Sequence, residues 1–222
     1  MFYEPAKNDH GLPYNPFKSC VVPRPIAWIS TISPDGNINL APFSQSNILG
    51  WDPPYVMFSP QTRRDGRRTD TVANAEAMGE FVYNMATYAL RDAVIESSMI
   101  EDPEVDELAA TGLTAVSCRL VRPPRVLESP VNLECKHHQT IVLPNGTPGQ
   151  FNSVVIGRVV GIHINDDYIG ADGKLDILAM RPLARMGYLD YTSVTDVFEM
   201  RPKGVPEDVV QAMAGGSPAL KG

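Results

Sequence analysis

Four arginines gather within the stretch QTRRDGRRTDT, on both sides of an Asp-Gly turn signal: Arg63, Arg64, Arg67 and Arg68. Thr69, Asp70 and Thr71 follow directly and begin an expected helix over residues 71–78, which Gly79 is placed to end. Guanidinium forks and the N–H groups of a helix start both suit phosphate oxygens. The stretch is therefore a candidate anion site, although a solvated charged face explains the same residues equally well.

A second polar group lies upstream, in the stretch APFSQSN at residues 41–47. Its hydroxyl and amide side chains offer donors and acceptors that a planar heteroaromatic ligand could use. The same groups could simply cap the loop, and the local residues favour that interpretation.

Other constellations do not reach the spacing that their chemistry needs. The chain holds no GxSxG, HExxH or GxGxxG motif, so serine or zinc hydrolysis and a Rossmann domain lack support. His137 and His138 are neighbours that would face opposite sides of a strand, so they cannot share one metal ion. The acidic run at residues 101–107 is interpreted as a solvated linker. Three widely spaced cysteines are expected to be buried reduced thiols, and no metal site is expected: Cys20, Cys118 and Cys135.

Composition limits the class of protein and its partners. The 222 residues carry a formal net charge of −7, which disfavours a nucleic-acid partner because phosphate neutralisation requires many Lys and Arg residues. No apolar run approaches the ~20 residues of a membrane span, and residues 1–17 lack the pattern of a signal peptide. We therefore expect a cytoplasmic protein with neither a nucleic-acid nor a membrane partner.

The elements that must position these groups are mostly strands. Residues 26–33 and 37–40 alternate around a Ser-Pro-Asp-Gly turn, which predicts a hairpin. Further strands and one further helix are predicted at residues 55–59, 80–85, 114–120, 125–127, 132–143 and 153–164, with the helix from residue 87 or 88 to about 98. This order indicates a mainly β protein, a β-barrel with α-helical additions. A short helix is also expected near residues 207–213.

Several motifs in order resemble the flavin reductase-like FMN-binding split-barrel family. They are VPRPIAWIST at residues 22–31, NLAPFS at 39–44, DTVAN at 70–74, GEFVYN at 79–84 and RPLARMGY at 181–188. The resemblance covers about residues 3–202. It implies one FMN-binding split-barrel domain over residues 1–202, with an N-terminal extension, and a C-terminal tail over residues 203–222.

The resemblance also implies a homodimer with FMN at the subunit interface. Position by position, Ser30, Thr31, Ser46 and Asn47 would contact the isoalloxazine or ribityl chain. Around the phosphate and ribityl end would lie Ser59, Asp70, Thr71 and Asn84. A third segment, which could reach the partner's flavin, contains Arg185, Tyr188 and Tyr191.

One departure concerns the phosphate. The family commonly has a lysine before the Asp-Thr pair, and this chain has Thr69 there. We expect Arg68 to supply the missing positive charge, because it lies next to that position and follows three other arginines.

The function implied by the resemblance is that of an FMN-dependent oxidoreductase. It would pass a hydride or electrons from NADH or NADPH through FMN to a small-molecule or protein acceptor, with the flavin supplying the chemistry. The catalytic residues are accordingly left unassigned. Two alternatives stay open: a non-catalytic FMN-binding electron carrier reduced by a partner protein, and a barrel that no longer binds flavin, suggested by Thr69.

Overall fold

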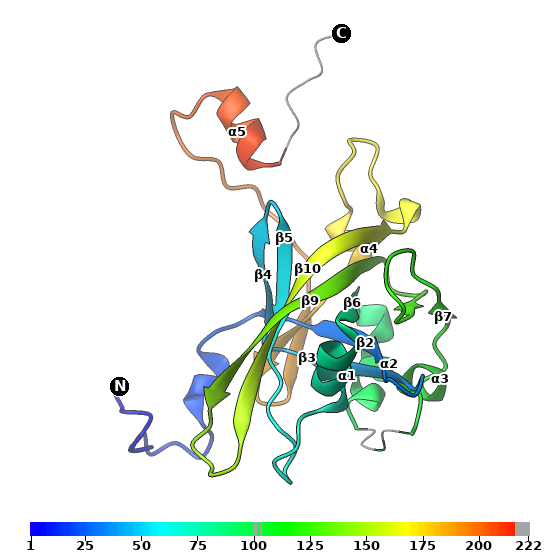
Figure 1. Ribbon diagram of the computed structural model, residues 1–222. Helices are drawn as coiled ribbons and strands as arrows, with labels where there is room; N and C mark the ends of the chain where they lie inside the picture. Colours follow the sequence, from blue (N-terminus) through cyan, green and yellow to red (C-terminus); the bar gives the residue numbers. More distant parts are fainter. Residues whose placement is uncertain (100–101, 103, 216–222) are drawn as a thin grey trace.

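The main element of the fold is a seven-stranded antiparallel sheet, seen in a computed structural model that describes residues 1–99, 102 and 104–215 (Figure 1). Neighbouring strands run antiparallel throughout. In spatial order the strands are β3 (Ile38–Phe43), β2 (Ala27–Ile32), β6 (Glu80–Met85), β9 (Val131–Pro144), β10 (Phe151–Ile164), β5 (Pro54–Phe58) and β4 (Ser46–Trp51). The predicted mainly β class with helical additions is confirmed.

The predicted opening hairpin is formed by β2 and β3. Its turn is closed by the Ser33 N–H, which donates to the Asn37 carbonyl at 2.8 Å, and Gly36 takes a positive φ of 94°. Strand β3 runs on to Phe43, although a loop was expected from residue 41. This is possible because β3 is an edge strand, where Pro42 needs no N–H for a further neighbour.

Helix α1 (Asp70–Met78) follows the arginine-rich stretch as predicted. Gly79 ends it in the left-handed conformation, and the Gly79 N–H donates to the Ala75 carbonyl at 3.0 Å. The second predicted helix is also present, as the 3₁₀ turn η2 (Tyr88–Leu90) followed by α2 (Arg91–Ser97).

The acidic run holds a short helix, α3 (Glu107–Ala110), so its interpretation as a solvated linker is wrong in part. Asp106 caps the helix by accepting from the Ala109 N–H at 3.0 Å, and Glu107 is buried. Local composition misled the prediction because the partner of Glu107 lies far away in the sequence. Residues 101 and 103 of this run lie outside the described residues.

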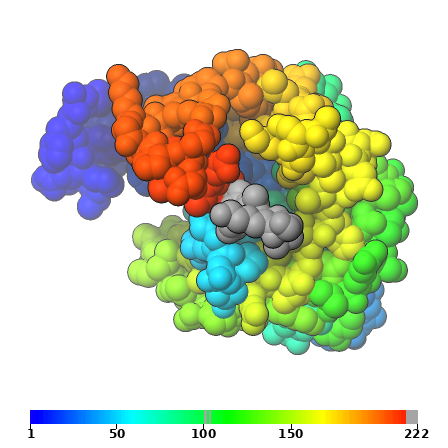
Figure 2. Space-filling view, turned by 90° about the horizontal axis from the view of Figure 1, so that it is seen from above, coloured from blue at the N-terminus to red at the C-terminus, as the bar shows by residue number. Residues whose placement is uncertain are grey.

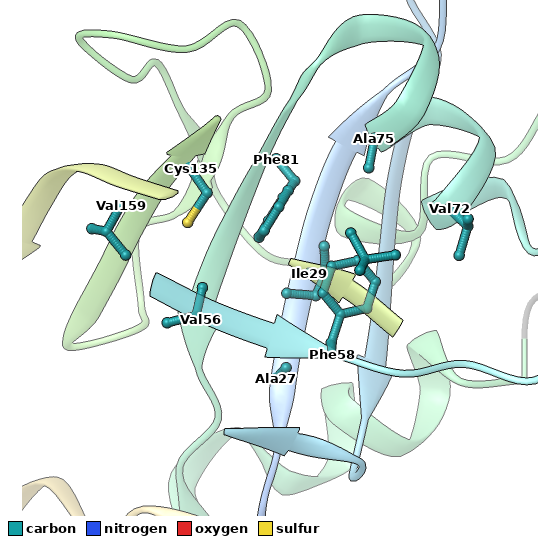
Figure 3. Close-up of a cluster of buried hydrophobic side chains, with 10 residues drawn as sticks. Ala27, Ile29, Val56, Phe58, Val72, Ala75, Phe81, Cys135 and Val159 are labelled. Carbon is teal, nitrogen blue, oxygen red and sulfur yellow. The ribbon is translucent and has the colours of Figure 1, made fainter. Parts of the chain in front are cut away.

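Strand β2 is buried on both of its faces and separates two apolar clusters. Ala27 and Ile29 pack with Phe58 and Phe81 in one cluster, which Figure 3 shows around the two phenyl rings. Trp28 lies in the other, with the cluster members Ile26, Leu40, Ala86, Val94, Leu108, Val126 and Leu183. Fixing both faces sets the register of β2 firmly, since a slip of one residue would exchange the two sets of side chains.

Short elements surround the main sheet. A three-stranded sheet contains β1 (Arg24–Pro25), β11 (Leu183–Gly187) and β12 (Asp190–Ser193), and a two-stranded sheet contains β7 (Ala115–Val116) and β8 (Arg125–Val126). The remaining helical elements are η1 (Pro16–Ser19), η3 (Asp166–Tyr168), α4 (Ile177–Met180) and α5 (Glu207–Met213). The strand predicted over residues 114–120 is therefore too long, because the N–H groups of Arg119 and Leu120 donate to the Glu134 carboxylate instead of to a strand.

Both terminal segments extend away from the sheet (Figure 1). The predicted helix in the C-terminal tail is confirmed as α5, and in the view from above this part of the chain, orange to red, curves across one end of the molecule (Figure 2). Residues 216–222 of the tail lie outside the described residues. Within the described part of the chain, every helix is too short or too polar to cross a lipid bilayer.

Candidate functional site

The start of α1, the arginine-rich loop before it and the end of β3 surround a cavity of about 430 Å³. Its apolar wall comes from β3, through Ala41, Pro42 and Phe43. Its polar wall is formed by Asn39, Thr62, Arg63, Arg64, Asp65, Arg67, Thr69, Asp70, Thr71, Ser97, Ser98 and Glu107. The arginines and hydroxyls of the predicted anion site thus lie on one concave surface, together with three carboxylates, those of Asp65, Asp70 and Glu107.

The arginine loop is held in shape by its own hydrogen bonds. The Arg63 N–H donates to the Arg67 carbonyl at 2.8 Å, and the Gly66 N–H donates to the Arg63 carbonyl at 2.9 Å. Asp65 accepts from the Arg67 N–H at 3.0 Å and from Arg67 Nε at 2.6 Å, and these bonds lower the pKa of Asp65. The turn at residues 63–67 is therefore closed by backbone hydrogen bonds, and the Arg67 side chain is held by Asp65.

Arg63, and not Arg68, is the arginine paired with Asp70. The Arg63 guanidinium forms an ion pair with the Asp70 carboxylate, and both residues line the cavity. Arg68 instead pairs with Glu76 on α1, and its guanidinium carbon lies 5.7 Å from the centre of the Phe151 ring. The expectation that Arg68 supplies the charge beside Asp70 is therefore corrected, because its side chain turns toward β10.

The N-terminus of α1 presents an unsatisfied hydroxyl. Thr69 is the N-cap residue, yet its side chain makes no capping bond, and its buried Oγ1 has no partner among residues 1–99, 102 and 104–215. Thr71 Oγ1 accepts from Asn39 Nδ2 at 3.0 Å, which fixes the first turn of the helix against β3. The N–H groups of a first turn have no partner within the helix, and the helix dipole favours negative charge there. An orphaned hydroxyl, a helix start and arginines on one wall fit a phosphate-bearing group.

Glu107 is a member of the cavity wall that the sequence reasoning missed. It is 4% exposed, and its Oε2 accepts from the Leu40 N–H at 2.9 Å. Burial raises the pKa of Glu107 to about 7, the Leu40 N–H opposes this, and the nearby Asp70 and Asp106 carboxylates add to it. The Asp106 cap before an apolar Leu was the one local signal of a helix here. An acid that titrates near neutral pH thus lies beside the candidate anion site.

Three of the predicted cofactor residues lie in the interior and bond to protein groups: Ser30, Thr31 and Asn84. Asn84 Nδ2 donates to the Trp28 carbonyl at 3.0 Å and to Ser30 Oγ at 3.1 Å. Asn84 Oδ1 accepts from the Val126 N–H at 3.0 Å and from Asn132 Nδ2 at 2.9 Å. These residues do not line the cavity.

Ser30 and Thr31 are satisfied in the same way. Ser30 Oγ donates to the Pro124 carbonyl at 2.5 Å, and Thr31 Oγ1 accepts from Asn74 Nδ2 at 3.2 Å. Because Asn74 belongs to α1, the second bond ties β2 to the helix whose N-terminus borders the cavity. Both side chains are placed to support that helix.

A further set of predicted residues lies at the β4–β5 edge of the sheet. Ser46 is buried and its Oγ donates to the Pro25 carbonyl at 2.8 Å, while Asn47 is exposed. Ser59 follows β5, and its N–H donates to the Gln45 carbonyl at 2.8 Å. None of these side chains is part of the cavity wall in the described structure.

The last two predicted residues, Arg185 and Tyr188, lie on and just after β11, in the smaller sheet. The Arg185 guanidinium bonds the Tyr191 hydroxyl and the Tyr188 carbonyl, and its central carbon lies 4.4 Å from the centre of the Tyr191 ring. Tyr188 takes a positive φ of 45° and packs against Tyr14 of the N-terminal segment, with ring centres 5.7 Å apart. Of the predicted cofactor residues, the cavity itself brings together Asp70 and Thr71.

The three cysteines are free thiols with different surroundings. Cys135 is buried in the core, Cys118 is half-buried and Cys20 is exposed. The expectation of burial is therefore wrong for Cys20, which lies at the end of the irregular N-terminal segment.

Comparison with known proteins gives a consistent result. A family model described as "Flavin reductase like domain" matches residues 19–181. An uncharacterized protein of Aquifex aeolicus (strain VF5) is 35% identical over 167 residues, which cover 75% of this chain and 82% of that protein.

Solved structures share the fold. Nitrilotriacetate monooxygenase component B from Bacillus cereus superposes with a TM-score of 0.82 at 26% identity, covering 90% of this chain and 98% of that one. A proposed flavin reductase with a split-barrel domain from Shewanella frigidimarina NCIMB 400 gives 0.76 at 21% identity, covering 91% and 99%. The split-barrel fold expected from the sequence is confirmed.

Proposed function

This chain belongs to the flavin reductase-like domain family, and from that premise we propose that it is an FMN-dependent oxidoreductase. It takes a hydride from NADH or NADPH and passes electrons to a small-molecule or protein acceptor. The likeness to the component B protein of a monooxygenase supports electron delivery to a partner. When bound, FMN supplies the electron-transfer chemistry itself, so the chain has only to bind, orient and shield it.

The observation that carries the proposal is the group of residues at the start of α1 that is suited to bind a phosphate. One cavity is lined by Thr69, whose hydroxyl has no partner in the described chain, by the first residues of α1, Asp70 and Thr71, and by Arg63. In the proposal the Thr69 hydroxyl, the first-turn N–H groups and the Arg63 guanidinium hold the FMN phosphate, with Thr71 beside them. Each charge-assisted hydrogen bond between a phosphate oxygen and a guanidinium contributes about 1.5–3 kcal/mol, which is enough to fix the phosphate end of FMN.

Three other groups of predicted residues have separate roles in the proposal. Ser30, Thr31 and Asn84 keep β2 and α1 in place through their protein hydrogen bonds, without touching FMN. Ser46, Asn47 and Ser59 border the flavin from the β4–β5 edge. From the partner subunit of a homodimer, the segment of Arg185 and Tyr188 covers the exposed flavin face and excludes water.

A homodimer is supported by large apolar side chains that the single chain leaves in water. Trp51 on β4 is 82% exposed, Leu189 after β11 is 86% exposed and Phe198, between β12 and α5, is 79% exposed. Exposed aromatic and aliphatic groups of this size commonly mark protein interfaces. The interface would also bury the open edge of β4.

Flavin reduction tests the proposal directly. The purified full-length chain is reconstituted with FMN and mixed anaerobically with NADH or NADPH in a stopped-flow instrument. We expect one of the two to bleach the bound flavin much faster than it bleaches free FMN. Bleaching no faster than free FMN with both nucleotides would favour the carrier function instead, and failure to take up FMN would exclude both.

The oligomeric state is tested separately. Sedimentation equilibrium of the FMN-loaded protein should give twice the chain mass. A monomer with full FMN occupancy would contradict the proposed interface.

A further inference from the structure

A second cavity, of about 840 Å³, lies between the paired strands β9 and β10 and the segments around β8 and η3. Polar groups that line it include Arg119, Arg125, Asn132, Glu134 and His163. It shares no lining residue with the cavity at the start of α1. The two cavities are therefore separate sites.

Three side chains with metal-binding atoms meet at this cavity. Cys118 Sγ, a Glu134 carboxylate oxygen and a His163 ring nitrogen all lie within 4.8 Å of one another. Cys118 follows β7, Glu134 lies on β9 and His163 lies on β10, so three separate segments of the chain supply them. Glu134 and His163 belong to the cavity wall, and Cys118 directly precedes the wall residue Arg119.

The carboxylate is held in a fixed orientation. Glu134, whose side chain is 1% exposed, accepts from the Arg119 N–H at 2.8 Å and from the Leu120 N–H at 2.6 Å. His163 Nε2 lies 2.5 Å from Glu134 Oε1. Hydrogen bonds of this kind behind a carboxylate are what orients a ligand toward a metal ion.

The ladder between β9 and β10 is irregular beside this cluster. Gly161 pairs with Glu134 next to a register shift in the β9–β10 ladder. A Cβ atom at position 161 would lie 3.4 Å from Glu134 Cδ and 3.4 Å from Leu120 Cδ1. These distances lie at the short end of ordinary van der Waals contact, so the Glu134 side chain and Leu120 pack closely against β10 at this point. Irregular ladders of this kind are common beside functional sites.

We propose that Cys118, Glu134 and His163 bind a borderline divalent transition-metal ion, Zn²⁺ by its chemistry. One thiolate sulfur, one imidazole nitrogen and one carboxylate oxygen form a mixed donor set that suits Zn²⁺ and excludes the oxygen-preferring Ca²⁺ and Mg²⁺. Three protein ligands leave a fourth position, which faces the cavity and takes a water molecule.

Geometry and charge both allow the ion. Tetrahedral bonds of about 2.0–2.3 Å place neighbouring ligand atoms roughly 3.3–3.8 Å apart, so the three atoms need to move by about 1 Å. The metal bonds replace the Glu134–His163 hydrogen bond, and Cys118 releases its proton as it binds. A thiolate and a carboxylate neutralise the two positive charges of the ion. The cavity wall also carries two carboxylates, Asp166 and Asp167, which attract a cation and offset the repulsion from the two arginines of the same wall.

A metal-free cluster is the simpler explanation, in which the Cys118 thiol and the His163 ring both hydrogen-bond the Glu134 carboxylate. The two explanations differ in whether the thiol binds the metal, so the test follows the sulfur.

Cobalt is the probe, because a Co²⁺–thiolate bond gives a charge-transfer band in the near ultraviolet and ligand-field bands in the red, beyond flavin absorption. Tag-free full-length protein, stripped with a chelator, is titrated with Co²⁺ with and without FMN and then with Zn²⁺. We expect one equivalent of Co²⁺ to bind with a thiolate band, and Zn²⁺ to displace it. The titration does not depend on flavin uptake, so it stands whether or not the proposed function does.

Variants complete the test. Cys118→Ser should abolish the thiolate band, and Cys118→Ser and His163→Gln should each weaken binding by at least about 100-fold, since second-shell changes alone cost 10–100-fold. Cys20→Ser and His10→Gln are the matched controls and should change nothing. Circular dichroism checks that each variant is folded. The proposal is overturned if the wild type gives no thiolate band, or if folded Cys118→Ser keeps the band or Cys20→Ser loses it.

Discussion

The carboxylate of Glu107 accepts a 2.9 Å hydrogen bond from the backbone N–H of Leu40, a residue 67 positions earlier in the chain. This bond joins α3 to the edge strand β3, on the wall of the cavity that also holds Asp70. Since burial holds the pKa of Glu107 at about 7, the charge of this wall changes within the physiological pH range.

The stability of the folded chain should therefore fall as the pH rises from about 4.5 to 7. The pKa of Glu107 is about 7 in the folded chain and near its ordinary value of 4.5 when unfolded, so between these values the folded state binds more protons. The free energy of unfolding then decreases from about pH 4.5 to pH 7, by no more than about 3 kcal/mol because solvent screening reduces the effect of a shift of this size.

Glu107→Gln isolates this contribution, because glutamine keeps an acceptor for the Leu40 N–H but does not ionise. Urea unfolding of both proteins at intervals from pH 4.5 to 8 should show the variant gaining stability relative to wild type up to about pH 7. The FMN affinity of wild type should also fall relative to the variant as the pH rises through about 7, since the carboxylate that forms in the folded protein repels the phosphate. A constant difference between the two proteins at all pH values would contradict the assignment.

Arg63 should matter more for FMN than Arg68 does. Arg63→Ala removes the cation beside Asp70 and leaves that carboxylate unpaired next to the proposed phosphate site. We expect FMN binding to weaken by roughly 10–100-fold, which corresponds to the loss of about 1.4–2.7 kcal/mol from charge-assisted hydrogen bonds. Fluorescence titration with FMN and with riboflavin measures this, and riboflavin affinity should hardly change because it lacks the phosphate.

Arg68→Ala and Arg67→Ala are the controls for this prediction. Arg68 pairs with Glu76 and is not part of the cavity wall, and the Arg67 side chain is 73% exposed and pairs with Asp65, so each variant should retain most of its FMN affinity. A loss in Arg68→Ala as large as that in Arg63→Ala would show that the phosphate lies toward β10.

The Thr69 hydroxyl should have opposite effects on stability and on cofactor binding. Without a ligand it is a buried group lacking a partner in the described chain, so Thr69→Val, of similar shape, should stabilise the flavin-free protein by about 1 kcal/mol. FMN binding should weaken by about tenfold, because the hydroxyl no longer bonds the phosphate. Thermal melts without FMN and titrations with FMN give the two quantities. A stability loss in the flavin-free variant would mean that Thr69 serves the helix instead.

The local sequence pattern was enough to predict a strand that is buried on both faces and elements whose ends are marked by a turn or a glycine. The alternation of β2, the turn after it and Gly79 at the end of α1 are all set by neighbouring residues, and the structure has each of them. The acidic run looked solvated because its composition is polar. Glu107 is buried because its carboxylate accepts a hydrogen bond from the N–H of Leu40, a residue too distant in the sequence to appear in any local pattern around Glu107.

Side-chain direction explains the corrections at the candidate site. The sequence places four arginines within six positions, but the turn at residues 63–67 decides that Arg63 meets Asp70 while Arg68 meets Glu76. The cluster of Cys118, Glu134 and His163 was hidden for a related reason, since its members lie on three segments without a recognisable spacing. Sequence reasoning can name the residue types of a site more readily than their partners.

Asn84 should be important for stability without a direct effect on FMN. Its amide makes four hydrogen bonds, to Trp28, Ser30, Val126 and Asn132, at the crossing of β2, β6, β8 and β9. Asn84→Ala leaves buried partners unsatisfied and should lower the free energy of unfolding by about 3 kcal/mol.

The ligand dependence of this loss separates a supporting role from a cofactor contact. If Asn84 acts only within the protein, the melting temperature should drop by the same amount with and without saturating FMN, because the linkage contribution of the ligand is unchanged. A variant of unchanged stability with weaker FMN binding would instead restore Asn84 to the flavin site. Asn47→Ala, at an exposed position on β4, provides the comparison, since it should leave the flavin-free melting temperature unaltered and lower only the FMN-dependent increase.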